Sequence, residues 1–126
     1  MDIRTRFGLL LAFAAVLGAR PAVAQAPAAV TAAAIAKGDS IFHTKGNCYA
    51  CHGANAQGAV GPNLTDAEWI HSDGSYDGIV KQINEGVAQA QSKSGIPMPA
   101  KGGATISDDE VKAVAAYVYS VSHKKP

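Results

Sequence analysis

The 126-residue chain lacks several features that would place it in common protein classes. It has only two cysteines, so it has no second cysteine pair to complete a zinc site. Basic residues number 11 against 10 acidic ones and form no basic stripe, which disfavours a nucleic-acid partner. No segment alternates apolar and polar residues convincingly, as a half-buried strand does. The length allows one domain and argues against two.

The first 24 residues have the pattern of a secretory signal peptide. Two arginines precede the apolar stretch 7–19, and residues 22–24, Ala-Val-Ala, are the small residues that signal peptidase requires. We expect cleavage before Gln25, export to the periplasm and no stable membrane insertion afterwards. The alternative is an uncleaved anchor, but it has about thirteen apolar residues where roughly twenty are needed to span a bilayer.

Large apolar side chains are scarce once the signal segment is set aside. Of the 44 apolar residues that follow position 24, 19 are alanine, and Leu64 is the only leucine. The remaining 25 give a domain of about 100 residues little apolar area to bury against the entropy of ordering its backbone. Domains with so thin a core usually need a disulfide, a metal or a cofactor. Eight basic and nine acidic residues leave this part with a charge of −1.

Helical periodicity predicts an all-α domain over residues 32–126. Apolar residues at helical spacing indicate helices at about 32–44 and 76–86. A third helix begins after Ser107, where Glu110 completes a capping box, and its buried face carries valines at 111, 114, 118 and 121. Residues 25–31 are rich in alanine and proline and are expected to form a flexible N-terminal segment.

Two long loops separate the predicted helices. Glycine and other residues that avoid regular structure are frequent in residues 53–66 and 88–106. Neither segment has the alternation of apolar and polar residues that is typical of a strand. Loops of this length would normally count against the assignment. They are acceptable where they wrap around a ligand.

The segment Cys48-Tyr49-Ala50-Cys51-His52 has the Cys-x-x-Cys-His pattern by which c-type haem is attached. Two thiols three positions apart lie on one side of a helical turn, so each can add to one vinyl group of the porphyrin. The imidazole of His52 can then approach the iron from the same side. The pattern therefore predicts one covalently bound haem c.

Three other readings of the cysteine pair are weaker. A zinc site would need two more ligands, and the other histidines lack zinc-finger spacing. A thioredoxin-like redox pair would follow a β-strand, whereas a helix precedes this pair. A disulfide between Cys48 and Cys51 would close too small a loop to stabilise the chain much.

Met98 is the leading candidate for the sixth iron ligand. It is the only methionine left after signal cleavage, and the prolines on either side stiffen the backbone that aims it. A lone methionine is more often core filler, but this one lies in a loop and not on a helix face. His71 is the best rival, ahead of His43, on the helix before the motif, and His123, near the C-terminus.

The chain resembles class I bacterial monohaem cytochromes c. The resemblance covers residues 36–122 and is especially close to the haem domains in cytochrome subunits of haem-copper oxidases. Those subunits often have a second haem motif or a membrane helix, which are not found here, and this favours a free carrier. The matching residues are Lys37-Gly38, Ile41-Phe42, the haem motif, Gly61-Pro62-Asn63-Leu64-Thr65-Asp66, Trp69, Met98-Pro99-Ala100 and Ala115-Ala116-Tyr117-Val118.

This resemblance implies a cytochrome c fold, with three to five helices and long loops wrapped around the haem, and assigns roles to individual residues. Gly38 and Tyr117 match the positions where the N- and C-terminal helices cross. The Pro62 carbonyl matches the group that accepts a hydrogen bond from the haem-ligating histidine, here His52. Trp69 matches a region near a haem propionate, to which its indole N–H could donate; plain core packing is the alternative.

A His/Met-ligated haem has no open position for substrate, so we expect one-electron transfer and not an enzyme activity. The first hypothesis is a monomeric periplasmic carrier between a donor, such as a quinol-oxidising complex or a dehydrogenase, and an acceptor oxidase or reductase. The second is a dedicated cytochrome subunit of one dehydrogenase or oxidase complex. The third is a gas-binding haem sensor or haem enzyme in which Met98 does not ligate.

Charged side chains suggest a weak dipole for steering partners. Lys45, Lys93 and Lys101 are expected around the exposed haem edge. Acidic residues are expected to cluster elsewhere, at positions 73, 77, 108, 109 and 110.

Overall fold

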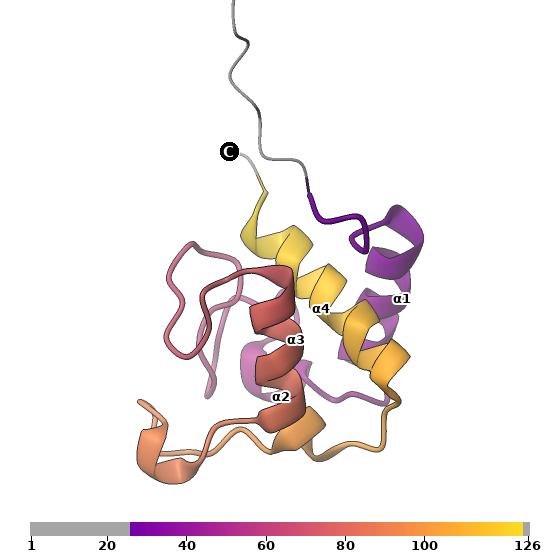
Figure 1. Ribbon diagram of the computed structural model, residues 1–126. Coiled ribbons are helices and arrows are strands. Elements are labelled where there is room, and N and C mark those ends of the chain that lie inside the picture. Colours follow the sequence, from indigo (N-terminus) through magenta and orange to yellow (C-terminus); the bar gives the residue numbers. More distant parts are fainter. Residues whose placement is uncertain (1–25, 125–126) are drawn as a thin grey trace, which may run out of the picture.

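The computed structural model describes residues 26–124, so the predicted signal peptide 1–24 lies outside the described part. Four α-helices and two short 3₁₀ helices follow one another along the chain (Figure 1). They are α1 (Ala32–His43), α2 (Tyr49–His52), α3 (Tyr76–Glu85), η1 (Gln89–Gln91), η2 (Ala100–Gly103) and α4 (Asp108–Ser122). Residues 26–124 contain no strand beyond one isolated bridge, which confirms the all-α class. No helix in this range has the length and apolarity to cross a bilayer.

The helices begin where short polar side chains cap them. The predicted capping box of α4 is present: the Ser107 hydroxyl accepts from the Glu110 amide at 3.3 Å, and the Glu110 carboxylate accepts from the Ser107 amide at 2.8 Å. Ser75 caps α3 and Thr31 caps α1 without such a box: each hydroxyl oxygen accepts a hydrogen bond from the backbone amide three residues further on. The helix ends agree with the predicted bounds to within one residue.

Helices α1 and α4 cross at Gly38, as the resemblance implied. A Cβ atom on Gly38 would lie 1.9 Å from the Ala113 carbonyl oxygen and 2.9 Å from the Cβ of Tyr117. Only a residue without a side chain allows the two backbones to come this close. The crossing therefore depends on this glycine.

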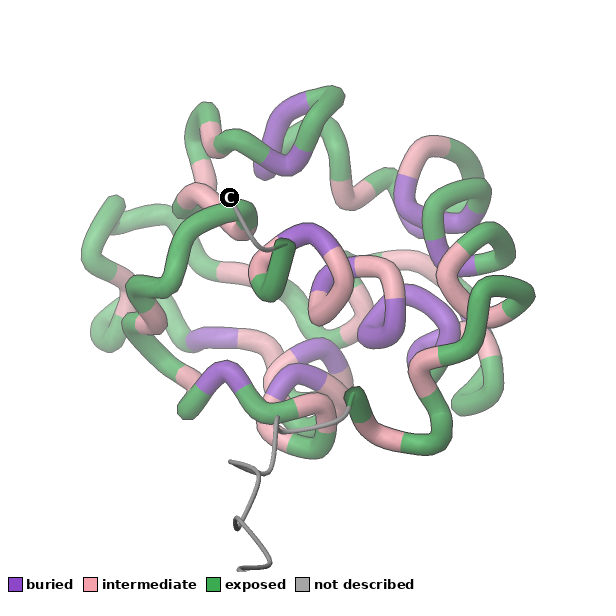
Figure 2. Tube along the Cα trace, turned by 90° about the horizontal axis from the view of Figure 1, so that it is seen from above, coloured by how far each residue is buried: buried purple, intermediate pink, exposed green. Residues whose placement is uncertain are grey.

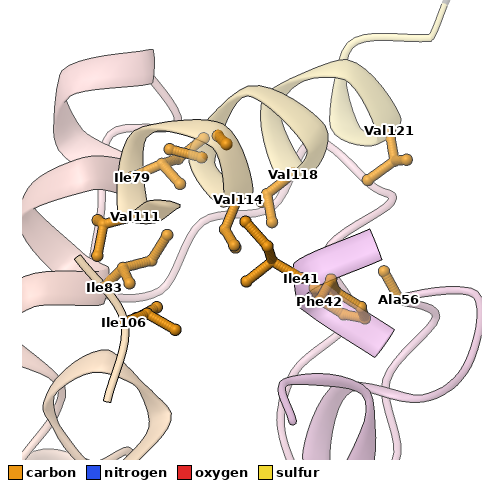
Figure 3. Packing of buried hydrophobic residues seen from close by; sticks show 12 residues of the cluster. Ile41, Phe42, Ala56, Ile79, Ile83, Ile106, Val111, Val114, Val118 and Val121 are labelled. Carbon is orange, nitrogen blue, oxygen red and sulfur yellow. The ribbon is translucent and has the colours of Figure 1, made fainter. Parts of the chain in front are cut away.

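The core lies between α4 and the helices packed against it (Figure 3). All four predicted valines of α4 are buried, and they meet Ile41 and Phe42 of α1 on one side and Ile79 and Ile83 of α3 on the other. The Tyr76 hydroxyl also donates to the Lys112 carbonyl at 3.2 Å, which ties α3 to α4. Buried segments concentrate along these helices, while much of the loop chain is exposed (Figure 2).

The loop after α3 has more structure than its composition predicts. It contains η1 and η2, and Val87 and Met98 form an isolated antiparallel bridge with N–H···O distances of 2.8 and 3.0 Å. Gly86 makes this bridge possible, since its φ is +71° and a Cβ there would lie 2.2 Å from the Met98 carbonyl oxygen. The backbone of Met98 is thereby fixed next to the end of α3.

We expect Gly38→Ala to destabilise the protein by about 2–3 kcal/mol, because the added methyl group meets backbone and not a movable side chain. Lys37→Ala, an exposed neighbour in the same helix, is the control and should change stability by less than about 0.5 kcal/mol. Denaturant unfolding of both variants measures the difference. Equal stability of the two variants would contradict the close crossing.

Candidate functional site

His52 is a buried imidazole with one ring nitrogen already engaged. It is the last residue of α2, its exposed fraction is 8%, and its Nδ1 lies 3.0 Å from the Pro62 carbonyl oxygen. Burial lowers the pKa of the ring, against the smaller opposing effect of that carbonyl. A neutral ring that donates from Nδ1 to Pro62 keeps the lone pair of Nε2 for a metal.

Gly61 gives the His52 ring its space. A Cβ on Gly61 would lie 3.0 Å from Cε1 and 3.1 Å from Nδ1 of that ring. The Gly61 amide also donates to the Cys51 carbonyl at 2.8 Å, so the loop is held against α2 by backbone contact. The Gly61-Pro62 pair therefore both admits the imidazole and orients it.

Cys48 is the N-cap residue of α2, Cys51 lies within that helix, and the two are not joined in a disulfide. Cys48 is half-buried, and burial raises the pKa of its thiol; Cys51 is exposed. Both line the same cavity as His52. The arrangement therefore offers two thiols and one imidazole along one wall.

This central cavity has a volume of about 390 Å³. Its lining brings together residues from α2, α3, α4 and both long loops, including every site residue that the sequence predicted. The apolar part of the lining comes from Leu64, Ile79, Ile83, Val87 and Val118. Such walls suit a large apolar ligand that also carries a few polar groups.

Two of the four candidates for the sixth ligand, Met98 and His71, reach this cavity. Met98 lines it from its bridge to Val87 and is half-buried, while His71 lines it and is exposed. His43 and His123 are not among the lining residues. One thioether and one imidazole among the candidate ligands therefore lie at the cavity.

Trp69 lies between the central cavity and the hydrophobic core. It lines the central cavity and also packs, partly buried, against the hydrophobic core. Its indole lies against the backbone of Gly74, where a Cβ would come within 2.4 Å of Nε1. Gly74 has a φ of +76°, a further reason for glycine at this position.

The expected separation of charges is wrong. Lys45 lies 2.5 Å from Glu110, and Lys101 lies 2.9 Å from Asp108, so two of the three lysines are paired with the acidic residues that were expected elsewhere. Lys93 alone of the three lines the central cavity. The start of α4 folds back toward these lysines, a proximity that residue positions along the chain do not reveal.

The donor set fits a haem better than a bare metal ion. Within residues 26–124, no three or more His, Cys, Asp or Glu side chains gather into a group that could hold an ion, so this part of the chain offers no zinc ligand set. Two thiols, an oriented imidazole and a thioether around an apolar cavity are instead what a covalently attached, axially ligated haem requires.

Comparisons with known proteins agree with this site. The family model described as cytochrome C oxidase, cbb3-type, subunit III matches residues 33–118. The chain is 40% identical over 90 residues to the cbb3-type cytochrome c oxidase subunit CcoP of Rubrivivax gelatinosus, which covers 71% of this chain and 26% of that protein. It is 38% identical over 99 residues to subunit FixP of Bradyrhizobium sp. (strain ORS 278), which covers 72% of this chain and 31% of that one.

A solved structure is also similar. The crystal structure of cytochrome cL from Methylophaga aminisulfidivorans MPT aligns with a TM-score of 0.61 and 27% sequence identity, covering 90% of this chain and 74% of that one. The chain spans about a quarter to a third of the length of the two curated oxidase subunits. The protein belongs to the cbb3-type subunit III family of cytochrome c domains, in which its Cys-x-x-Cys-His segment implies covalently bound haem c.

Proposed function

We propose that this cytochrome is a periplasmic electron carrier with one haem c attached to Cys48 and Cys51 and ligated by His52 and Met98. The observation that carries the proposal is that these four side chains line one cavity with largely apolar walls. A haem held there supplies reversible one-electron chemistry at its iron.

The chain's own residues prepare both axial positions. The Pro62 carbonyl holds His52 in the orientation and protonation state that suit ligation. The bridge to Val87 and the flanking prolines fix the Met98 backbone at the same cavity. A His/Met pair favours the reduced iron more than two histidines would, and it leaves no position for substrate. Electron transfer without substrate chemistry is the function that follows.

Trp69 is assigned to the haem periphery within this proposal. It lies in the lining of the central cavity, and its indole N–H is a donor suited to a propionate. The apolar side chains of α3 and α4 that line the cavity would contact a porphyrin bound there. The haem thus adds the apolar body that a chain with so few large side chains lacks.

The partners in this proposal are redox proteins: a quinol-oxidising complex or dehydrogenase as donor and an oxidase or reductase as acceptor. The relatives named as oxidase subunits support an acceptor of the oxidase type. They also favour a second candidate function, in which the chain is a dedicated cytochrome subunit held in one such complex.

Met98→Ala should remove the weak far-red sulfur-to-iron absorption band of the ferric protein and lower its reduction potential, since the thioether ligand is lost. His71→Ala, which removes the rival ligand from the same cavity, is the matched control and should keep the band. Absorption spectroscopy and redox titration measure both effects. A high-spin ferric spectrum in the unmutated protein would instead favour a gas-binding sensor or haem enzyme.

Size-exclusion chromatography of a native periplasmic extract separates the two candidate functions. A free carrier should elute as a small monomer, detected by its haem absorbance, because it meets its partners only transiently. Constant co-elution with a dehydrogenase or oxidase at all salt concentrations would reject the free carrier in favour of the dedicated subunit.

Without haem, the chain after residue 24 should be largely unfolded, because its few large apolar side chains bury little area alone. Circular dichroism of protein produced without haem attachment should show little cooperative melting. Cys51→Ala and His52→Ala should likewise yield little stable holoprotein. A compact apoprotein with a sharp thermal transition would contradict this dependence.

A further inference from the structure

His43, which the electron-transfer site does not use, has acceptor groups at both ring nitrogens. Its Nδ1 lies 2.8 Å from the Asp39 carbonyl oxygen and 3.0 Å from an oxygen of the Asp39 carboxylate. Its Nε2 lies 2.6 Å from the Ala54 carbonyl oxygen. Carbonyl and carboxylate oxygens can only accept hydrogen bonds, so each ring nitrogen has to donate.

A neutral imidazole carries one N–H and cannot satisfy both sides. Whichever nitrogen lacks the proton would turn its lone pair toward an oxygen at hydrogen-bonding distance. We propose that His43 is a positioning residue, held as an imidazolium, that ties the end of α1 to the loop immediately after the haem-binding motif. This goes beyond the proposed electron-transfer function and does not depend on it.

The His43 bond anchors the first residues after His52. Ala54 lies in a turn in which the Ala56 amide donates to Gly53 at 3.0 Å and the Gly58 amide donates to the His52 carbonyl at 2.7 Å. Ala56 is completely buried. The Ala56 side chain packs in the core with Ile41 and Phe42 of α1. Among the described hydrogen bonds of the 53–58 turn, the Nε2 bond is the one that joins it to α1.

The surroundings of His43 favour the charged ring. Asp39 on α1 supplies a carboxylate, while the facing titratable groups from other elements are Tyr49 of α2, stacked at 6.1 Å between ring centroids, and Tyr117 of α4, edge-on at 6.1 Å. The 53–58 turn contains no titratable residue. None of these three neighbours is a cation; one lysine, Lys124, lines a shallow pocket together with Asp39 and Tyr117.

The direction of the pKa agrees with this geometry. The Ala54 carbonyl, followed by the Asp39 carbonyl, raises the pKa of His43 above its ordinary value, against the opposing effect of partial burial, and the Asp39 carboxylate adds to the rise. A group whose pKa is higher in the folded state stabilises the fold fully below its unfolded pKa, roughly 6.5 for histidine. That stabilisation is lost as the pH rises through the folded pKa.

The test uses the protein as isolated with its cofactor, in the reduced state. Long-range nitrogen–proton NMR spectra between about pH 5 and about pH 9 should show both His43 ring nitrogens protonated at about pH 7. In His43→Gln, whose neutral side chain has donors on only one of its two polar atoms, hydrogen-exchange protection of the Gly58 amide should fall on the order of tenfold at low pH. The difference from wild type should shrink as the pH rises.

His123→Gln is the matched control. His123 is the C-cap residue of α4, and its described ring hydrogen bonds involve Nδ1 alone. It should leave the protection of Gly58 unchanged. A His43 ring with one protonated nitrogen at about pH 7 would overturn the proposal. So would a His43→Gln effect that is the same at all pH values, since that would mean a structural role without charge. Neither result bears on haem ligation, which the far-red band reports separately.

Discussion

The close approach of α1 and α4 at Gly38 is the contact on which the other elements depend. A side chain at that position would collide with the backbone of Ala113, so the Ala113 carbonyl of α4 packs directly against the backbone of α1 at Gly38. Helix α4 in turn supplies most of the buried valines and receives α3 on its other side. A chain with few large apolar residues thereby builds a scaffold from backbone proximity, which needs no bulky side chains.

The loops are held by hydrogen bonds to backbone where apolar contacts are scarce. The Gly61 amide joins the 53–66 loop to Cys51, the Pro62 carbonyl holds His52, and the Val87–Met98 bridge holds the second loop. Each of these contacts fixes one wall of the central cavity. Their positions make the loops ordered parts of the site despite their Gly- and Pro-rich composition.

The sequence was most informative where structure is local. Helical spacing and the Ser107–Glu110 box predicted the helices, and the Cys-x-x-Cys-His spacing predicted which residues meet along the cavity wall. Contacts between segments far apart in the chain could not be predicted from the sequence. The Lys45–Glu110 ion pair and the Val87–Met98 bridge arise from how the chain folds back, and the bridge needs a positive φ at Gly86 that composition alone does not specify.

Two histidines on either side of the cysteine pair show how backbone oxygens set the state of an imidazole. His52 is buried and meets one carbonyl, so desolvation dominates, its pKa falls, and one nitrogen stays available to a metal. His43 is one-third exposed and meets oxygens at both nitrogens, so hydrogen bonding dominates, its pKa rises, and no nitrogen is left to ligate. Both residues are histidines, so it is the number of facing oxygen acceptors that leaves Nε2 of His52 available and occupies both ring nitrogens of His43.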